Sequence, residues 1–590
     1  MVDVSAKARA FGMATQFVNL RGGAALKLPQ QIAVIAQGSS DSVFSTAKAR
    51  GTSAAEIGNR AGWGSPAHLI ADQLLPANGD GVGTIPVTFY LLADDASGAP
   101  SVGDITPSGT ATKAQAWRVS VSGILSNEFV IPAGAIVVND VLRKMYDAIV
   151  GVLKMPVKAS FTYGAVTAGA LTGGTGNGTL TLPSVHAGSA PRPGVYTLKL
   201  KTVVANGGVW TLYDPDGVIV ADDITMTPGV GQATAVSNVG GLDFTLTDGT
   251  TDFGAGAQFT ITVPATKIVL TSKWKGVSAN AIKLAMSGDS TLGVSFGITQ
   301  PTGGLVNPSI ANALSQFGGS WETLVLNAME ITDLVTLDLL KEFGVGRWNE
   351  LVRKPFVAFC GTTAVAVATA SAVPASRPDD YVNAALVAPG SPNLPFVVAA
   401  RQLARIAVEA NENPPTDYGA AEVTGITGGT DGEQWDYTKK DLALKAGCSS
   451  VDVVDNVVRI ADVVTFYHPT GEEDPAYRYV VDIVKLQNIM YNIGLPFTTK
   501  EWSGAPLVPD AQVVTNPKAR QPKHVIAVVA GAVDALGKAA ILSDPETAKK
   551  TIKANITGPK RIDFEVTVQL SGNTNVKSAT LKFGFYYGAA

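Results

Sequence analysis

Histidines and cysteines are the residues of this 590-residue chain most able to carry chemistry, and they are few. None of the histidines lies in an H-E-x-x-H or C-x-x-C setting, the spacings that place zinc ligands on one face of a helix or turn. The two cysteines, Cys360 and Cys448, lie in unrelated contexts, which favours buried free thiols over a disulfide or a cysteine metal site. The four histidines are His68, His186, His468 and His524.

Three other motifs resemble part of a catalytic or binding site, but simpler explanations or missing partner residues argue against each one. Gly288-Asp289-Ser290 is similar to a hydrolase serine motif, yet no Asp-x-x-His partner follows it. The loop Gly173–Gly178 is glycine-rich like a phosphate loop, but it leads into a strand and no Lys-Ser/Thr follows. Four aspartates could ligate calcium, although turn geometry explains them more simply. They are Asp214, Asp216, Asp222 and Asp223.

The sequence therefore predicts no catalytic residue, no cofactor and no metal site, and the chain is expected not to be an enzyme.

Basic residues form the one local charge asymmetry, near the C-terminus. A solvated helical face is the simplest interpretation, and a contact with an acidic partner is the alternative. The residues of this predicted surface are Lys518, Arg520, Lys523, Lys549, Lys550 and Lys553.

Composition points towards assembly. The net charge of −4 and the pI of about 5.7 give no reason to expect direct nucleic-acid binding. Only 16% of residues are charged, which suits subunits whose surfaces are covered by partners. The polar start, Met1–Gly12, predicts no secretory signal, so we expect the protein to be made and kept in a cytoplasm. Phe356–Ser376 is uncharged but rich in small residues, which predicts a buried strand followed by a small-residue helix or loop rather than stable membrane insertion.

Alternation of strand and helix patterns predicts an α/β (α+β) multidomain fold with an inserted all-β domain and terminal β-strand arms. The insertion is expected because Val157–Phe161 and Lys267–Leu270 would join if the Gly-Thr-rich part between them were removed. The predicted segments are 1–30, an N-terminal arm; 31–100, the first part of the α/β core; 101–162 with 265–290, an α/β outer domain; 163–264, the inserted all-β domain; 291–438, the central part of the core; and 439–590, a C-terminal domain with a terminal hairpin.

The terminal hairpin is predicted from two alternating segments, Phe564–Leu570 and Ala579–Tyr587. A lone hairpin is marginal in water, and an aromatic edge strand invites a further strand from another copy. The residues predicted to pair between subunits are Phe564, Val566, Val568, Leu570, Leu581, Phe583, Phe585 and Tyr587.

Several motifs resemble the contractile phage tail sheath proteins, particularly the Mu-like family. The similarity is carried by Leu442–Gly447, Val457–Ile460 with Val464–Tyr467, and the helix that opens on Tyr477-Arg478-Tyr479. Lys273–Ile282 is similar to a conserved-looking turn of that family, and Asn516–Gly537 with Asp544-Pro545 gives a third block. The resemblance covers most of residues 25–160 and 265–590, while 163–264 resembles small β domains that decorate phage heads and sheaths.

The resemblance implies a virion structural protein that is assembled in the host cytoplasm. It implies stacked hexameric rings in a helical array around a tail tube protein, contraction that drives the tube through the host envelope, and contacts with baseplate and tail terminator proteins. It also implies that the C-terminal domain faces the tube, where the basic residues would meet an acidic surface. The alternative that the residues leave open is a β-rich adhesin or carbohydrate-binding virion protein whose activity lies in 163–264.

Overall fold

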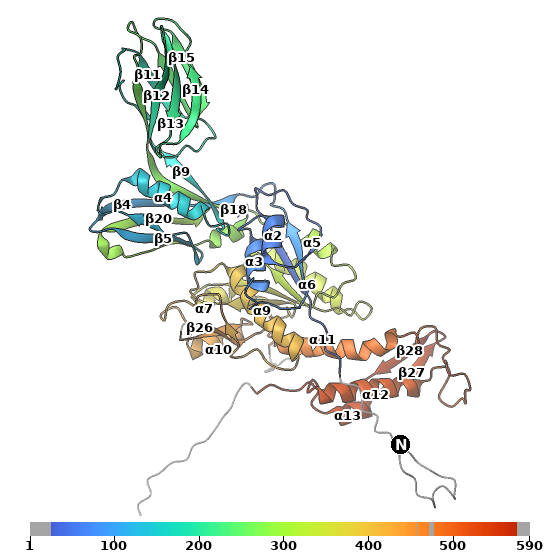
Figure 1. The fold of residues 1–590 in the computed structure, drawn as a ribbon. Helices are drawn as coiled ribbons and strands as arrows, with labels where there is room; N and C mark the ends of the chain where they lie inside the picture. The colour runs from blue at the N-terminus through green and yellow to red at the C-terminus, as the bar shows by residue number, and fades with distance from the viewer. Residues whose placement is uncertain (1–24, 456, 471–476, 575–590) are drawn as a thin grey trace, which may run out of the picture.

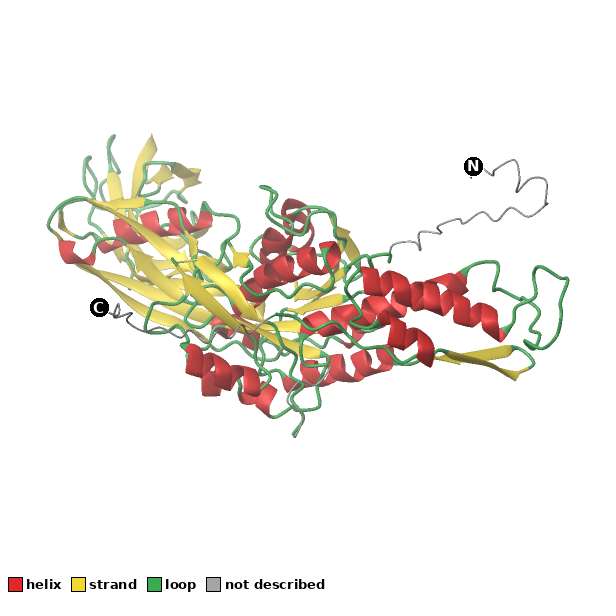
Figure 2. Cartoon of the chain, turned by 90° about the horizontal axis from the view of Figure 1, so that it is seen from below, coloured by secondary structure: helices red, strands yellow, loops and turns green. Residues whose placement is uncertain are grey.

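The structure is a computed structural model that describes residues 25–455, 457–470 and 477–574. The molecule is elongated, with a strand-rich end formed by the middle of the sequence and a helical end formed by its last part (Figure 1). Seen from below, strands dominate one end, and helices with one short hairpin form the other (Figure 2). The predicted mixed α/β fold class is confirmed at this level.

A six-stranded sheet in the order β2-β3-β1-β21-β22-β23 forms the centre of the molecule. It is parallel except for β2, and it combines strands from two distant parts of the chain, with Ile32 opposite Leu324. All six residues of β1 are buried, as expected for a parallel sheet covered on both faces. The strands are β2 (Ala49–Gly51), β3 (Val87–Leu92), β1 (Ile32–Gln37), β21 (Leu324–Asn327), β22 (Val357–Thr362) and β23 (Asn383–Val387).

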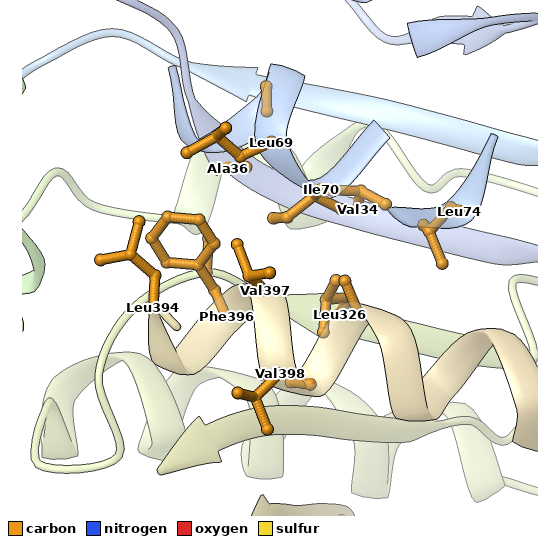
Figure 3. Packing of buried hydrophobic residues seen from close by; sticks show 14 of the residues in the cluster. Val34, Ala36, Leu69, Ile70, Leu74, Leu326, Leu394, Phe396, Val397 and Val398 are labelled. Atoms are coloured by element: carbon orange, nitrogen blue, oxygen red, sulfur yellow. The ribbon is translucent and has the colours of Figure 1, made fainter. Parts of the chain in front are cut away.

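Helices cover this sheet through apolar faces. In Figure 3, α3 and α9 meet over β1 and β21, with Ile70, Val34 and Val397 in one layer of the core. Local signals set the helix starts, since Pro395 occupies the first turn of α9 and Asp333 accepts a hydrogen bond from Thr336 N at the start of α6. The helices of this part are α2 (Ala54–Ala61), α3 (Pro66–Leu74), α5 (Ala311–Ser315), α6 (Leu334–Trp348), α7 (Val367–Ala370), α8 (Ala372–Ala375) and α9 (Pro395–Glu412).

The predicted strand and small-residue helix in Phe356–Ser376 are present as β22 followed by α7 and α8. Among the described residues, no helix is long and apolar enough to cross a membrane.

A second unit lies beside the central sheet, built from residues on both sides of 163–264. Its main sheet has the order β20-β4-β18-β9 and is covered by the amphipathic helix α4 (Val138–Val150). The short strand β8 pairs with β4 of this main sheet. A smaller sheet has the order β19-β5-β6, with β7 paired to β5. The strands are β4 (Pro100–Ala111), β5 (Gln115–Val121), β6 (Ile124–Leu125), β7 (Phe129–Ile131), β8 (Gly134–Ala135), β9 (Val157–Tyr163), β18 (Ala265–Lys275), β19 (Leu284–Ser287) and β20 (Val294–Thr302).

Residues 164–264 form two antiparallel sheets with a hydrophobic core of their own, which we call the β unit. Trp210 lies at its centre, with ring centroids 5.0 Å from Phe253 and 5.5 Å from Phe259. The β unit lies between β9 and β18 along the chain. These two strands pair directly with each other, and Tyr163 of β9 is opposite Ala265 of β18. Its strands are β10 (Thr167–Ala168), β17 (Gln258–Val263), β12 (Gly194–Val204), β13 (Gly207–Tyr213) and β14 (Ile219–Thr225) in one sheet, and β11 (Thr179–Val185), β16 (Leu242–Thr247) and β15 (Ala233–Val239) in the other.

The last part of the chain forms a small sheet followed by a helical region. The sheet has the order β24-β26-β25 and lies beside helix α10 (Tyr437–Lys445). The helical region, residues 480–574, has its own core around Val525, Val529 and Leu536, and we call it the C-terminal region. The elements are β24 (Glu422–Val423), β25 (Ser450–Val454), β26 (Val457–Asp462), α11 (Val480–Gly494), α12 (Pro522–Lys538), α13 (Pro545–Thr551), β27 (Lys553–Gly558) and β28 (Arg561–Glu565).

Candidate assembly surfaces

The predicted terminal hairpin differs from the hairpin that the structure contains. β28 pairs antiparallel with β27, which precedes it, with Phe564 opposite Ala554. The strand also ends at Glu565 rather than Leu570, so the predicted strand is too long. The sequence signal for this hairpin is the Gly558-Pro559 turn, which separates its two strands. The second predicted strand, with Leu581, Phe583, Phe585 and Tyr587, lies outside the described residues.

The first four residues predicted to pair between subunits contact the core of their own subunit. Phe564, Val566, Val568 and Leu570 are half-buried and pack against the core of the C-terminal region. The Phe564 ring stacks on Phe497, with centroids 5.3 Å apart. Their apolar side chains are therefore occupied, and what β28 offers a neighbour is its backbone, because it pairs only with β27 among the described strands.

The strand β25 offers a second open edge, since it pairs with β26 alone within the described residues. A groove of about 910 Å³ runs beside β26. Its lining includes Arg459 and Asp462 from β26 and Ser571 from the segment that leaves the C-terminal region. Open strand edges thus lie close to the last described residues.

The structure divides the predicted basic surface into two patches along α12. The first patch holds Lys518, Arg520 and Lys523 at the start of the helix. Arg520 lies 3.5 Å from Glu501 and over the Trp502 ring, with 5.5 Å between the guanidinium carbon and the ring centroid. Lys518 and Lys523 are exposed. The first patch therefore presents two exposed ammonium groups beside a guanidinium that is already engaged.

The second patch holds Lys549, Lys550 and Lys553, beside the end of α12 and in β27. Lys549 Nζ lies 2.8 Å from Asp534 Oδ1 and 2.6 Å from Glu546 Oε1, and these two carboxylates raise the pKa of the Lys549 ammonium. Lys553 is exposed and lies across the hairpin from Glu565. Lys550 is exposed too, so charge available to a partner resides mainly on Lys550 and Lys553.

The histidines serve packing and backbone contacts at four separate places. His68 is buried, its Nδ1 accepts a hydrogen bond from Gly64 N, and burial lowers the His68 pKa to about 4. His186 pairs with Asp243 at 2.9 Å in the β unit, and His524 Nδ1 accepts from Gln521 N at the start of α12. No group of three potential metal-ligating His, Cys, Asp or Glu side chains occurs in the described part of the chain.

The remaining motifs have structural roles. Asp214 Oδ1 accepts hydrogen bonds from Asp216 N and Val218 N, which is turn geometry. Asp222 and Asp223 both pair with Lys201. The cysteine prediction is confirmed, because both thiols are free and buried, and burial raises the pKa of each to about 12.

The comparison with known proteins gives one informative sequence match. Over 249 residues the chain is 26% identical to the Mu-like prophage FluMu tail sheath protein of Haemophilus influenzae, which covers 40% of this chain and 50% of that protein. The resemblance to phage tail sheath proteins is confirmed. The chain spans about half the length of the curated relative it matches, and no protein-family profile matches it.

Solved structures with low similarity include two sheath tail proteins. The one from Listeria innocua has a TM-score of 0.40 and 11% identity, over 93% of each chain. The one from Desulfitobacterium hafniense has a TM-score of 0.37 and 8% identity, over 95% of this chain and 100% of that chain. Because both TM-scores lie below 0.5, the relationship rests on the sequence match.

Proposed function

We propose that this chain is a structural subunit of a contractile phage tail sheath. In this proposal it polymerises in stacked hexameric rings around a tail tube protein, is capped by baseplate and terminator proteins, and contracts to drive the tube through the host envelope. The match to a tail sheath protein is the observation that carries the proposal. In this proposal the mature protein is part of the virion and is assembled in the host cytoplasm.

The open backbone edges of β28 and β25 support linkage between copies. Strand addition at such an edge supplies backbone hydrogen bonds that do not depend on how the attached bodies are oriented. Subunits joined in this way can rotate and slide as rigid bodies while they remain connected. In our proposal the arm before Gln31 and the residues after Thr574 supply the added strands.

The basic patches support a weak contact with the tube. Exposed ion pairs contribute about 1 kcal/mol or less each and are screened by salt. Lys523 in the first turn of α12 and Lys550 in α13 are exposed, so each is available to a tube surface. Weak contacts suit this role, because a sheath must release the tube when it contracts.

We assign the β unit to an inserted, decoration-like domain at the outer surface. Its separate core and its position at the end of the molecule opposite the C-terminal region support this assignment (Figure 1). Glycan binding by this unit would be the adhesin alternative.

Negative-stain electron microscopy of the purified chain, alone and with a candidate tube protein, tests the proposed function. Hollow cylinders with a regular helical repeat are expected, and their length should follow the tube when it is present. Monodisperse particles under every condition would contradict the proposal, and glycan-array binding by the chain would then favour the adhesin.

A further inference from the structure

We propose that helix α11 ties both ends of the described chain together through one stripe of buried polar side chains, and that this tie carries tension between the two terminal arms during contraction. The stripe consists of Lys485, Asn488 and Asn492. The inference rests on the proposed function, because it assigns a load path within the same sheath subunit.

The spacing of the stripe places it on one face of the helix. Positions i, i+3 and i+7 follow one another along a helix surface, and about 10 Å separates the first from the last at 1.5 Å per residue. Lys485 and Asn488 are fully buried, and Asn492 is 8% exposed. Buried polar groups are costly unless they are hydrogen-bonded, so the stripe needs partners on the segments that cover it.

The N-terminal segment supplies partners through its backbone. Asn492 Oδ1 accepts from Leu26 N at 2.9 Å, and Asn492 Nδ2 donates to Leu26 O at 2.8 Å. Asn488 Oδ1 accepts from Leu28 N at 2.9 Å. Asn488 Nδ2 donates to Val484 O on its own helix, which fixes the orientation of that amide. The two asparagines thus hold residues 26–28 much as a neighbouring strand would.

The C-terminal segment is held by the lysine. Lys485 Nζ donates to Ser571 O and to Asn573 Oδ1, both at 2.6 Å, and lies 2.9 Å from Asp482 Oδ1. An ammonium has three donors, so all of them are used. Asn573 Nδ2 donates to Pro415 O at 2.8 Å, which adds a second attachment for the same segment.

The helix is also anchored to the body of the subunit. Gln487 is a buried amide of the same helix, and its Nε2 donates to Pro355 O at 3.1 Å and Thr323 O at 3.4 Å, beside the central sheet. A pull on either arm is therefore shared between α11 and the end of α9, where Lys27 Nζ donates to Glu412 O and Asn573 Nδ2 donates to Pro415 O. Because the stripe binds mainly backbone groups, it holds an extended segment largely irrespective of that segment's side chains.

Hydrogen exchange tests the tie in the full-length chain. In an Asn488→Ala/Asn492→Ala variant, the amides of Leu26 and Leu28 should exchange about tenfold faster, since each loses its acceptor. Gln487→Ala is the matched control, because it removes an equally buried amide of α11 that touches neither end, and it should leave those two amides unchanged. Unchanged exchange in the double variant would overturn the inference, as would equal acceleration in the control.

Contraction of assembled sheaths tests whether α11 carries tension between the two arms. Sheaths of the double variant, and of Lys485→Met, should form on the tube but break on contraction into pieces less than half the wild-type length. Lys485→Met keeps the test decisive if the double variant does not fold. Contraction of both variants without breakage would overturn the load path. If the wild-type chain forms no sheath, the proposed function fails, and the exchange comparison still decides whether α11 holds the N-terminal segment.

Discussion

At the scale of single residues, ion pairing decides which charges can act on a partner. Lys549 is engaged by Asp534 and Glu546, whereas Lys550 and Lys553 are exposed. The three lysines form one predicted surface because they are close together in the sequence. Nothing in the sequence shows that Asp534 of α12 lies beside α13, where it pairs with Lys549.

Reversing the charges of the two exposed lysines should therefore weaken the contact with the tube. We expect Lys550→Glu/Lys553→Glu to weaken tube-templated assembly severalfold at low ionic strength, since each contact contributes about 1 kcal/mol or less. The difference from wild type should shrink as salt shortens the screening length. Sedimentation of polymer from soluble subunit over a salt series measures it. A difference that persists unchanged at high salt would exclude the electrostatic explanation.

His68 should contribute to the pH dependence of stability. Its folded pKa of about 4 lies below its ordinary value of 6.5, mainly because of burial, while Asp72 acts in the opposite direction. The unfolded chain therefore takes up a proton first as pH falls, and stability is lost between about pH 6.5 and pH 4, by roughly 3 kcal/mol at most. Stability is independent of this group above pH 7.

The comparison variant is His68→Asn, whose amide oxygen can accept the Gly64 N–H. Denaturant unfolding at pH 7 and pH 4.5 should show a smaller loss of stability in this variant than in wild type. An identical loss in both proteins would show that other groups cause the acid sensitivity.

At the scale of elements, the terminal strands carry the linkage. We expect a chain lacking Ala579–Ala590 to fold, with a melting temperature within about 4 °C of wild type, because Val525, Val529 and Leu536 already form a buried core in the C-terminal region. The same chain should not form long tubular sheaths. Circular dichroism and electron microscopy measure the two outcomes, and normal polymerisation of the truncated chain would refute the linkage by this segment.

The β unit should be removable. Tyr163 and Ala265 are opposite residues of an antiparallel pair, so their Cα atoms lie about 5 Å apart and an Asn-Gly turn can join them after deletion of 164–264. The shortened chain should fold and still assemble, because the two hydrophobic cores are separate. Loss of assembly with retained folding would mean that the unit forms subunit contacts.

Periodicity predicted the elements whose environment is set locally. The sequence predicts a buried strand at Gln31–Ala36 and an amphipathic helix over Asn139–Leu153, because a central parallel strand is apolar throughout and a surface helix repeats every 3.6 residues. The structure contains both, as β1 (Ile32–Gln37) and α4 (Val138–Val150). The hairpin β27–β28 was missed, because its first strand follows a helix directly and only Gly558-Pro559 marks the turn. The α11 stripe was missed for another reason: Asn488 and Lys485 find their partners about 460 and 86 residues away, respectively.

At the scale of the whole molecule, the proposed function determines which end of the subunit faces the tube. The helical C-terminal region and the β unit lie at opposite ends of an elongated subunit, with the central sheet between them (Figure 1). A subunit with tube-facing basic patches must then place α12 at the inner surface of the polymer and the β unit at the outer surface.

Cryo-electron microscopy of the polymer formed around the tube tests this claim most directly. We expect six-fold rings with α11, α12 and α13 lining the inner surface, the β unit projecting outward, and strands from neighbouring copies continuing the β28 or β25 edge. A polymer with the β unit against the tube, or one whose neighbours share no strand, would contradict it.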